Sequence, residues 1–504
     1  MQRNVLEYLE QSALNYPEKT AFADTEESVT YRELWTRAKR IAAGLQKAIG
    51  AQVRKPVVVL VDKDIQSIIS FFGVAYTGNF YVPIDKDLPR ERIESMVSLL
   101  EPAGIIYHDA TGACAKEIET DVLKFDYKEL LSAQEDEAYL SRVRGQALDT
   151  DPLYAIFTSG STGVPKGVLV AHRSVIDLVD NFKEEFGFDE SCIFGNQAPF
   201  DFDVSVKDIY STIKNGATMY IVPKKLFVTP AKLIDFLNEK KINTVIWATS
   251  ALVIVANFKS FKNSVPQYLK RVMFSGEVMP NKVLNYWRQY LPDIMYVNLY
   301  GPTEITCNCT FYKVDREFDD NEVLPIGKKF LNTGILLLDS ERKGLAEEGG
   351  IGEICVSGSS LALGYYNNEE KTREAFIQNP LNSSYPERIY CTGDLARYDE
   401  NDDLIFLSRR DFQIKHMGHR IELGEIEVAV NALPFIEAAV CLYDDKNKKI
   451  VLFYQAGEDC KKEIVAGLGR VLPKYMWPNV FRHYEKLPMN KNAKIDRVKL
   501  KEEL

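Results

Sequence analysis

The chain has 504 residues, of which 46% are hydrophobic and 27% are charged. This length exceeds what one hydrophobic core normally holds, so we expect several structural units of a globular protein. The formal net charge of −10 argues against a general nucleic-acid binder, because such proteins carry a basic surface. Eight scattered cysteines without a C-x-x-C pair favour free thiols in a reducing compartment over a zinc site.

The beginning of the chain and its apolar runs predict neither export nor membrane insertion. Residues 1–22 carry charges throughout and lack the apolar core of a signal peptide. No run approaches the ~18 apolar residues of a membrane-spanning helix. We therefore expect a cytoplasmic protein without membrane insertion.

Apolar strands alternate with amphipathic helices through the first half of the chain. Residues 5–16 and 31–49 have apolar positions at helical spacing, and the segment SVT before the second is a helix-capping signal. Strands are predicted at 55–64, 103–109, 153–159, 218–223, 244–250 and 271–277, and further helices at 67–78 and 233–242. This alternation predicts βαβ units and parallel sheet, and hence an α/β fold.

The character of the sequence changes after about residue 320. The strands become short and are separated by turns, which indicates an antiparallel or barrel-like section. From Asp411 a short α+β segment follows, and SRRDFQ (408–413) lies between the two textures. We therefore predict a large domain over 1–410 and a small domain over 411–504.

A glycine-rich segment, FTSGSTGVPKG (157–167), follows a short apolar stretch. Glycine lets backbone N–H groups approach an anion closely, while hydroxyl groups and Lys166 add donors and charge, so the segment is typical of a phosphate-binding loop. It is not a Walker A loop, because Pro165 stands five residues after Gly160 and Gly167 follows the lysine. Taken alone, it is either a flexible surface loop or another kind of phosphate site.

Further segments carry unusual residue combinations. They are NLYGPTE (298–304), YCTGD (390–394), SRRDFQIKHMGHRIELGEIE (408–427), LPKYMWP (472–478) and NAKIDR (492–497). Each has a plain structural interpretation when taken alone: Tyr300 as a core aromatic residue, Glu304 as a helix cap, Lys494 as a surface lysine. Their order along one chain is far more specific than any single segment.

Taken together, from YVPIDKDLPRERI (81–93) to NAKIDR, these segments resemble the adenylate-forming superfamily of acyl-CoA synthetases, firefly luciferase and the adenylation domains of nonribosomal peptide synthetases. Within it, the chain is most similar to stand-alone amino-acid adenylation enzymes of the D-alanine–D-alanyl carrier protein ligase type. The resemblance implies an α/β fold with a large N-terminal domain of βαβ-type sheets, a small barrel-like section, and a small mobile C-terminal α+β domain.

The resemblance also implies a two-step reaction with ATP and Mg²⁺. An amino-acid carboxylate attacks the α-phosphorus of ATP, which gives an aminoacyl-AMP and releases pyrophosphate. The acyl group then passes to the phosphopantetheine thiol of a carrier protein, which we expect to act in trans because no carrier module is recognisable in the sequence. The alternatives are an acyl-CoA synthetase, which uses CoA as acceptor, and a non-catalytic binding protein.

By the same resemblance, three residues are expected to be catalytic. Glu304 would hold Mg²⁺, Thr303 would contact the α-phosphate, and Lys494 would bridge the substrate carboxylate and the α-phosphate. Asp411 would be the hinge about which the small domain rotates between the two steps. One face of that domain would supply Lys494, and the other would present HMGHRIELGEIE to the pantetheine thiol.

A further set is expected to bind ATP. The glycine-rich loop would cover the β- and γ-phosphates, Tyr300 would stack on adenine, and Asn298 would face the adenine Watson–Crick edge. Asp394 would take the ribose hydroxyls, with Arg409 beside it. The full set is Thr158, Ser159, Gly160, Ser161, Thr162, Gly163, Lys166, Gly276, Asn298, Tyr300, Gly301, Asp394 and Arg409.

The amino-acid pocket is implied in the same way. Asp203 matches the aspartate that holds a substrate α-ammonium, which favours an amino acid over fatty or aryl acids. The side-chain pocket would consist of Val204, Lys207, Trp247, Met273, Ser275, Leu299, Cys307 and Asn308. Lys207, Trp247 and Ser275 depart from a D-alanine pocket and leave the amino acid open. Lys207 would face a substrate acceptor or acid, or else reach Asp208 or solvent.

Overall fold

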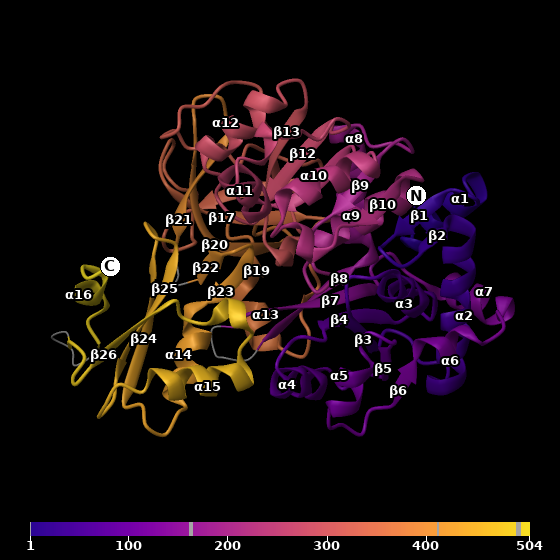
Figure 1. Ribbon diagram of the computed structural model, residues 1–504, viewed down its shortest axis with the longest axis horizontal. Helices are drawn as coiled ribbons and strands as arrows, with labels where there is room; N and C mark the ends of the chain where they lie inside the picture. The colour runs from indigo at the N-terminus through magenta and orange to yellow at the C-terminus, as the bar shows by residue number, and fades with distance from the viewer. Residues whose placement is uncertain (1, 161–164, 411–412, 490–494) are drawn as a thin grey trace.

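The computed structural model describes residues 2–160, 165–410, 413–489 and 495–504. These residues form helices and five β-sheets in a mixed α/β arrangement (Figure 1). Two large sheets make up most of the molecule, an antiparallel sheet follows them in the chain, and a small domain with its own sheets ends it. The predicted fold class is confirmed. No helix in the described ranges combines the length and the apolar character needed to cross a membrane.

The first large sheet has the strand order β18-β8-β7-β4-β3-β5-β6. Its strands are β3 (Pro56–Val61), β4 (Phe80–Asp85), β5 (Gly104–Tyr107), β6 (Lys124–Asp126), β7 (Pro152–Thr158), β8 (Lys166–Ala171) and β18 (Gly364–Tyr365). All six residues of β3 are buried, as expected of a parallel strand covered on both faces. β7 and β8 pair antiparallel, so the glycine-rich loop connects two adjacent strands.

The second large sheet has the order β15-β14-β13-β12-β11-β9-β10-β1-β2. Its strands are β1 (Thr20–Ala23), β2 (Ser28–Thr30), β9 (Ile193–Asn196), β10 (Thr218–Ile221), β11 (Thr244–Ala248), β12 (Arg271–Ser275), β13 (Met295–Tyr300), β14 (Thr310–Lys313) and β15 (Lys328–Lys329). β11, β12 and β13 are parallel and in register, so their carboxyl ends meet at one edge of the sheet, where ligands of α/β proteins bind.

Helices α3 (Ile65–Tyr76) and α9 (Val204–Asn215) join the two large sheets. The rings of Phe72 and Tyr210 meet edge to face at 5.9 Å, and the hydroxyls of Tyr81 and Tyr210 lie 3.0 Å apart. One hydrophobic core contains residues from both sheets and both helices. This packing fixes α9, which carries two of the predicted pocket residues, Val204 and Lys207.

The remaining helices of the large domain cover the sheets from outside or connect their strands. They are α1 (Leu6–Asn15), α2 (Tyr31–Ile49), α4 (Arg90–Leu100), α5 (Gly112–Glu117), α6 (Tyr127–Leu131), α7 (Glu137–Gln146), α8 (His172–Phe186), α10 (Pro230–Glu239), α11 (Thr249–Asn257), α12 (Asn281–Tyr290) and α13 (Glu369–Ala375). The predicted cap of α2 is present, because the Thr30 and Glu33 side chains each accept a hydrogen bond from the other's backbone N–H.

An antiparallel sheet follows, as the short strands after residue 320 predict. It consists of β16 (Thr333–Leu338), β17 (Gly352–Gly358), β19 (Phe376–Gln378), β20 (Arg388–Tyr398) and β21 (Leu404–Arg409). Asp394 on β20 lies opposite Arg409 on β21 in the strand register. The sheet thus brings the two residues predicted at the ribose together.

The small domain has a hydrophobic core of its own, drawn from residues 421–476. Its elements are β22 (Gln413–His416), β23 (His419–Glu422), α14 (Leu423–Asn431), β24 (Ala438–Asp444), β25 (Lys449–Gln455), α15 (Lys461–Val471), β26 (Val480–Tyr484) and α16 (Arg497–Lys501). The β22–β23 hairpin lies on the side that faces the large domain, and α16 lies at the opposite side, beyond β24 to β26 (Figure 1).

Candidate active site

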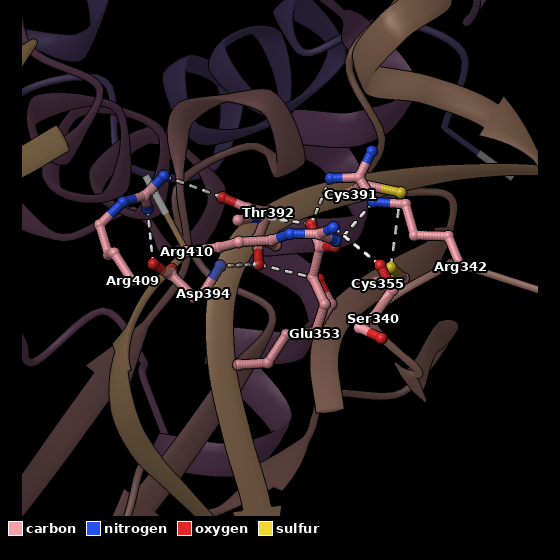
Figure 2. A network of polar contacts seen from close by, with 11 residues as sticks. Ser340, Arg342, Glu353, Cys355, Cys391, Thr392, Asp394, Arg409 and Arg410 are labelled. Atoms are coloured by element: carbon pink, nitrogen blue, oxygen red, sulfur yellow. Dashed lines mark hydrogen bonds and ion pairs between the residues drawn. The ribbon is translucent and has the colours of Figure 1, made fainter. Parts of the chain in front are cut away.

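Asp394 is the centre of a buried hydrogen-bonded group at the antiparallel sheet. Its Oδ1 is 2.5 Å from Nη1 of Arg409, and its Oδ2 accepts a hydrogen bond of 2.5 Å from the Tyr300 hydroxyl. Arg409 also donates to the Thr392 carbonyl at 3.2 Å (Figure 2). Three residues predicted at the nucleoside therefore meet, and the carboxylate is held in one orientation by two donors.

Tyr300 and Asn298 lie at the end of β13. Asn298 donates from Nδ2 to the Pro325 carbonyl at 2.8 Å, which leaves its amide oxygen as the acceptor for an amino group such as that of adenine. Lys415 on β22 places its Nζ 5.5 Å from the centre of the Tyr300 ring. The sequence interpretation missed this contact between the small domain and Tyr300, the residue predicted to stack on adenine.

Glu304 is fully buried in a short helical turn after β13. Its Oε1 accepts a hydrogen bond from the Tyr365 hydroxyl at 2.8 Å, and its Oε2 is 2.6 Å from Nη1 of Arg420 on β23. Burial alone would raise the pKa of Glu304, but the charges of Arg420 and Lys166 lower this pKa to about 2. The carboxylate is thus ionised, as a ligand of Mg²⁺ must be. Thr303, beside it, is also buried.

The start of the glycine-rich loop is bonded to the small domain. The Ser159 hydroxyl donates to the Arg420 carbonyl at 2.9 Å and accepts from the Glu422 backbone N–H at 3.1 Å. The Gly160 N–H donates to Oε2 of Glu425, whose other oxygen is 2.6 Å from Arg92 of α4. These contacts seat β23 and the start of α14 against the loop.

Two other residues of the predicted phosphate loop can be placed. Thr158 ends β7, and its buried hydroxyl has no hydrogen-bond partner among the described residues. The ammonium of Lys166 is 4.9 Å from the centre of the Tyr365 ring, and burial together with the charge of Arg420 lowers its pKa. Ser161, Thr162 and Gly163 lie outside the described residues, as do Lys494 and Asp411.

The two predicted glycines lie at the ends of neighbouring strands. Gly276 follows β12 with φ +98°, and no atom lies within 4 Å of the place that a Cβ would take. Gly301 follows β13, where a Cβ would come within 2.6 Å of the Cys307 carbonyl oxygen and Asn308 Cα. Glycine is thus needed at 301 for the close approach of two backbone segments.

Asp203 immediately precedes α9, and Lys207 lies one turn further along it. Burial raises the pKa of Asp203, while a hydrogen bond from Thr303 and the charge of Lys207 oppose that rise. The Cys307 thiol donates to the Asp203 backbone carbonyl at 2.8 Å. The Lys207 ammonium donates to the Ser275 hydroxyl at 3.1 Å, so it reaches across to β12 and not to solvent.

Four further pocket predictions fall on the same side of the sheet or at the start of α9. Val204 is the first residue of α9. Met273 and Leu299 belong to the core shared with α9, and Asn308 is buried with neither amide atom bonded within the described part of the chain.

The prediction that places Trp247 in this pocket is wrong. Its indole N–H donates to the Gly195 carbonyl at 2.7 Å and its ring packs edge to face on Phe227, within a separate core on the other face of the sheet. The register pairs Ala248 with Ser275, so Ala248 points to the α9 side instead. The departure from a D-alanine pocket that Trp247 suggested therefore has no basis.

A cavity of about 2100 Å³ lies between the small domain and the large one. Asp394 and Arg409 line it from the antiparallel sheet, Glu277 from the large domain, and Lys415 from the small domain. Asp203, Lys207 and Ser275 are not among its lining residues. The cavity thus reaches Asp394 and Arg409, which are predicted at the ribose, but not these three residues of the predicted amino-acid pocket.

Glu353 on β17 lies close to two cysteines, Cys355 and Cys391, whose sulfur atoms are 3.5 Å apart (Figure 2). Both of its carboxylate oxygens are 2.7 Å from Arg342, and Oε2 is 3.0 Å from Arg410. Two guanidinium groups therefore already neutralise this carboxylate, and the cluster is a structural ion-pair network in preference to a metal centre.

The segment that forms the β22–β23 hairpin is expected from the sequence at the pantetheine thiol, but the sequence assigns its residues no partners in the large domain. The Gly418 N–H donates to Oε1 of Glu277 at 3.1 Å, and Arg420 binds Glu304. Gly418 has φ +83°, and a Cβ there would lie 3.4 Å from the side chains of Ala248 and Ser250. The dense charge of GHRIELGEIE was the available signal, but it does not reveal which partners the charges meet.

Comparison with known proteins finds a matching family and similar proteins over nearly the whole chain. A family model described as AMP-binding enzyme matches residues 9–366. The chain is 32% identical over 517 residues to a D-alanine--D-alanyl carrier protein ligase of Bacillus licheniformis, an alignment that covers 99% of each protein. It is 33% identical over 512 residues to bacitracin synthase 1 of Bacillus licheniformis, and it spans only 9% of the length of that synthase.

Solved structures have the same fold. IdnL1 superposes with a TM-score of 0.82 at 26% identity, over 97% of this chain and 99% of that one. Holo-PA1221, a nonribosomal peptide synthetase protein that contains adenylation and PCP domains and is bound to a vinylsulfonamide inhibitor, superposes with a TM-score of 0.84 at 24% identity. That alignment covers 100% of this chain and 84% of holo-PA1221.

Proposed function

This chain belongs to the AMP-binding enzyme family, and we propose that it activates an amino acid as aminoacyl-AMP and then transfers the aminoacyl group to the phosphopantetheine thiol of a carrier protein in trans. The family implies an adenylate-forming enzyme that uses ATP. The amino-acid substrate, the carrier protein and the residue roles are the proposal.

The position of Asp203 carries the amino-acid assignment. This carboxylate lies beside Thr303, and Glu304 is close enough for its charge to affect the pKa of Asp203. A substrate ammonium would form a charge-assisted pair with Asp203. The carboxylate of the same substrate would then lie toward Thr303, where the α-phosphate is proposed to bind. Fatty and aryl acids have no group that would use Asp203.

Glu304 is the residue proposed to hold Mg²⁺, and its ionised, buried carboxylate fits that ion. When bound, Mg²⁺ neutralises phosphate charge. One carboxylate suffices because Mg²⁺ usually keeps waters and phosphate oxygens as its other ligands. In this arrangement Glu304 is paired with Arg420, so metal binding belongs to an arrangement in which the hairpin has withdrawn.

In the first step, a substrate carboxylate oxygen would bond to the α-phosphorus while the bond to pyrophosphate breaks. Lys494 is proposed to stabilise the negative charge that develops there, and rotation about Asp411 would remove it afterwards. In the second step, the carrier thiol would attack the acyl carbon and AMP would leave. The arrangement described here, with the hairpin against Glu304 and Glu277, suits the second step.

ATP–pyrophosphate exchange across all L- and D-amino acids tests the first step. We expect exchange with one amino acid or a narrow group, and then transfer to a phosphopantetheinylated carrier protein in preference to free CoA. Exchange with fatty or aryl acids alone would refute the amino-acid assignment. Faster transfer to CoA than to any carrier protein would favour the acyl-CoA synthetase alternative.

A further inference from the structure

Lys207 is a fully buried cation with an incomplete set of partners. Its Nζ donates to the Ser275 hydroxyl at 3.1 Å, and no carboxylate oxygen of the described residues lies within 4.0 Å of it. An ammonium has three N–H donors, and a buried charge without an anionic partner is costly. The site is therefore incomplete in a way that a ligand could correct.

The two acids nearest to Lys207 along α9 do not form an ion pair with it. One oxygen of Asp208 accepts a hydrogen bond of 2.8 Å from Nδ2 of Asn196, and the other has no hydrogen-bond partner among the described residues. Burial raises the pKa of Asp208, and the charges of Lys207 and Lys63 only oppose that rise. Asp203 faces Thr303 and is proposed to take the substrate ammonium. Lys207 does not turn to solvent either, because none of its surface is exposed.

The surroundings of Lys207 suit a short side chain with a polar end. On the α9 side of the sheet, β11, β12 and β13 present Ala248, Met273 and Leu299, which are small or apolar. Asn308 follows Cys307, whose thiol is bonded to the Asp203 backbone. Asn308 is 2% exposed, and neither the oxygen nor the nitrogen of its side-chain amide has a hydrogen-bond partner in the described chain.

We propose that the amino acid activated by this enzyme has a side chain that ends in a carboxylate, as in aspartate or glutamate, and that Lys207 binds this carboxylate. The inference rests on the proposed amino-acid activation. Asp203 immediately precedes α9 and Lys207 follows one turn later, so the two side chains lie on one face of the helix, with Lys207 the more deeply buried. An acidic amino acid would place its ammonium at Asp203 and its side-chain carboxylate at Lys207.

The electrostatics around Lys207 agree. Burial lowers the pKa of Lys207, although the nearby Cys307, Asp203 and Asp208 oppose this shift. A substrate carboxylate would supply the missing anion and favour the ammonium form again. A neutral side chain would leave the cost of burial uncompensated, so it should be selected against.

Wild-type ATP–pyrophosphate exchange with aspartate, glutamate, asparagine, glutamine and alanine is the first test. Each acid differs from its amide by one group of nearly equal size, so the ratio of their kcat/KM values isolates the charge. We expect the preferred acid to exceed its amide by roughly 100-fold, because a buried charge pair is lost with the amide. In the full panel of L- and D-amino acids, a neutral or basic amino acid as the best substrate would overturn the inference and leave the proposed function standing. Exchange with no amino acid of that panel would overturn both.

Lys207→Met provides the second test, with Lys214→Met as matched control. Lys214 lies on the same helix but pairs with Asp180 outside the pocket. We expect Lys207→Met to bring the acid-to-amide ratio close to one, Lys207→Arg to restore part of it, and Lys214→Met to leave it unchanged. An unchanged ratio in Lys207→Met would show that the lysine only ties α9 to β12. If Lys207→Met does not fold, the wild-type ratio still decides.

Discussion

Arg420 of the small domain is paired with Glu304 of the large domain at 2.6 Å, and Glu304 has no exposed surface. The pair places the β22–β23 hairpin at the carboxylate that we assign to Mg²⁺. A guanidinium and a hydrated metal ion cannot occupy the same oxygen at once. The ion pair therefore fits the proposed second step, in which the hairpin is against Glu304, and not the first step, in which Glu304 would hold Mg²⁺.

Arg420→Gln should slow acyl transfer more than adenylation. The variant loses the ion pair that seats the hairpin, and we expect transfer to fall roughly 10- to 100-fold. The measurement is single-turnover transfer from supplied aminoacyl-adenylate, compared with pyrophosphate exchange. Arg482→Gln, which breaks a surface pair with Glu503 in the same domain, is the control. Equal slowing of both steps by Arg420→Gln would contradict the assignment.

Asp203→Asn should strongly weaken amino-acid activation and leave ATP binding nearly intact. The lost charge-assisted bond is worth about 1.5–3 kcal/mol, and more when it is buried. The KM for the amino acid should rise accordingly in pyrophosphate exchange, while ATP affinity, measured by calorimetry, stays the same. An unchanged KM for the amino acid would remove Asp203 from the substrate site.

Lys494→Ala and Asp411→Pro should separate the half-reactions. Loss of one positioned cation should slow adenylation roughly 10²–10³-fold, while transfer from a preformed adenylate stays nearly unaffected. Proline fixes φ, so Asp411→Pro should hold the domain in one orientation and preserve only one half-reaction. If Lys494→Ala slowed both steps by the same factor, Lys494 would be a fixed active-site residue and rotation would be refuted.

The KM for an acidic amino acid should pass through a minimum as pH changes. Burial raises the pKa of Asp203, so at acid pH this carboxyl is neutral and loses the substrate ammonium. Burial lowers the pKa of Lys207, so at alkaline pH this amine is neutral and loses the substrate carboxylate. Cys307 does not add charge, because burial raises its thiol pKa.

The control for this profile is Lys207→Met. In this variant the KM should still rise toward acid pH. Toward alkaline pH the KM should rise only because the substrate's own amino group loses its proton. An alkaline limb identical in wild type and Lys207→Met would show that Lys207 does not titrate against the substrate.

The parts of the fold that follow from local sequence were predictable. The apolar run of β3 is buried on both faces, and α2 begins after the Thr30 cap. The strand predicted at 244–250 ends two residues early, because Thr249 begins α11. Asp394 lies beside Arg409 because of the register of two antiparallel strands. The sequence motifs imply this proximity only through the family resemblance.

Two features could not be predicted from the sequence alone. The first is the face of the sheet to which the Trp247 side chain points. A strand buried on both faces has no alternation of polar and apolar residues, so its sequence does not show which residues lie on which face. The contacts of Arg420 and Lys415 were the other, because they depend on how two separately packed domains are placed. The many charged residues of GHRIELGEIE indicate that this segment has charged partners, but they do not identify those partners.

Arg410 forms polar contacts with three residues of the large domain. Its N–H donates to the Gly393 carbonyl at 2.7 Å, and its guanidinium binds Glu353 and the Ser340 carbonyl. None of these partners belongs to the small domain. A gene fusion made just after Arg410 would therefore leave these contacts intact. Related chains could exchange their C-terminal portions at this position. Such chimaeras would keep the amino-acid choice of one parent and acquire the acceptor recognition of the other.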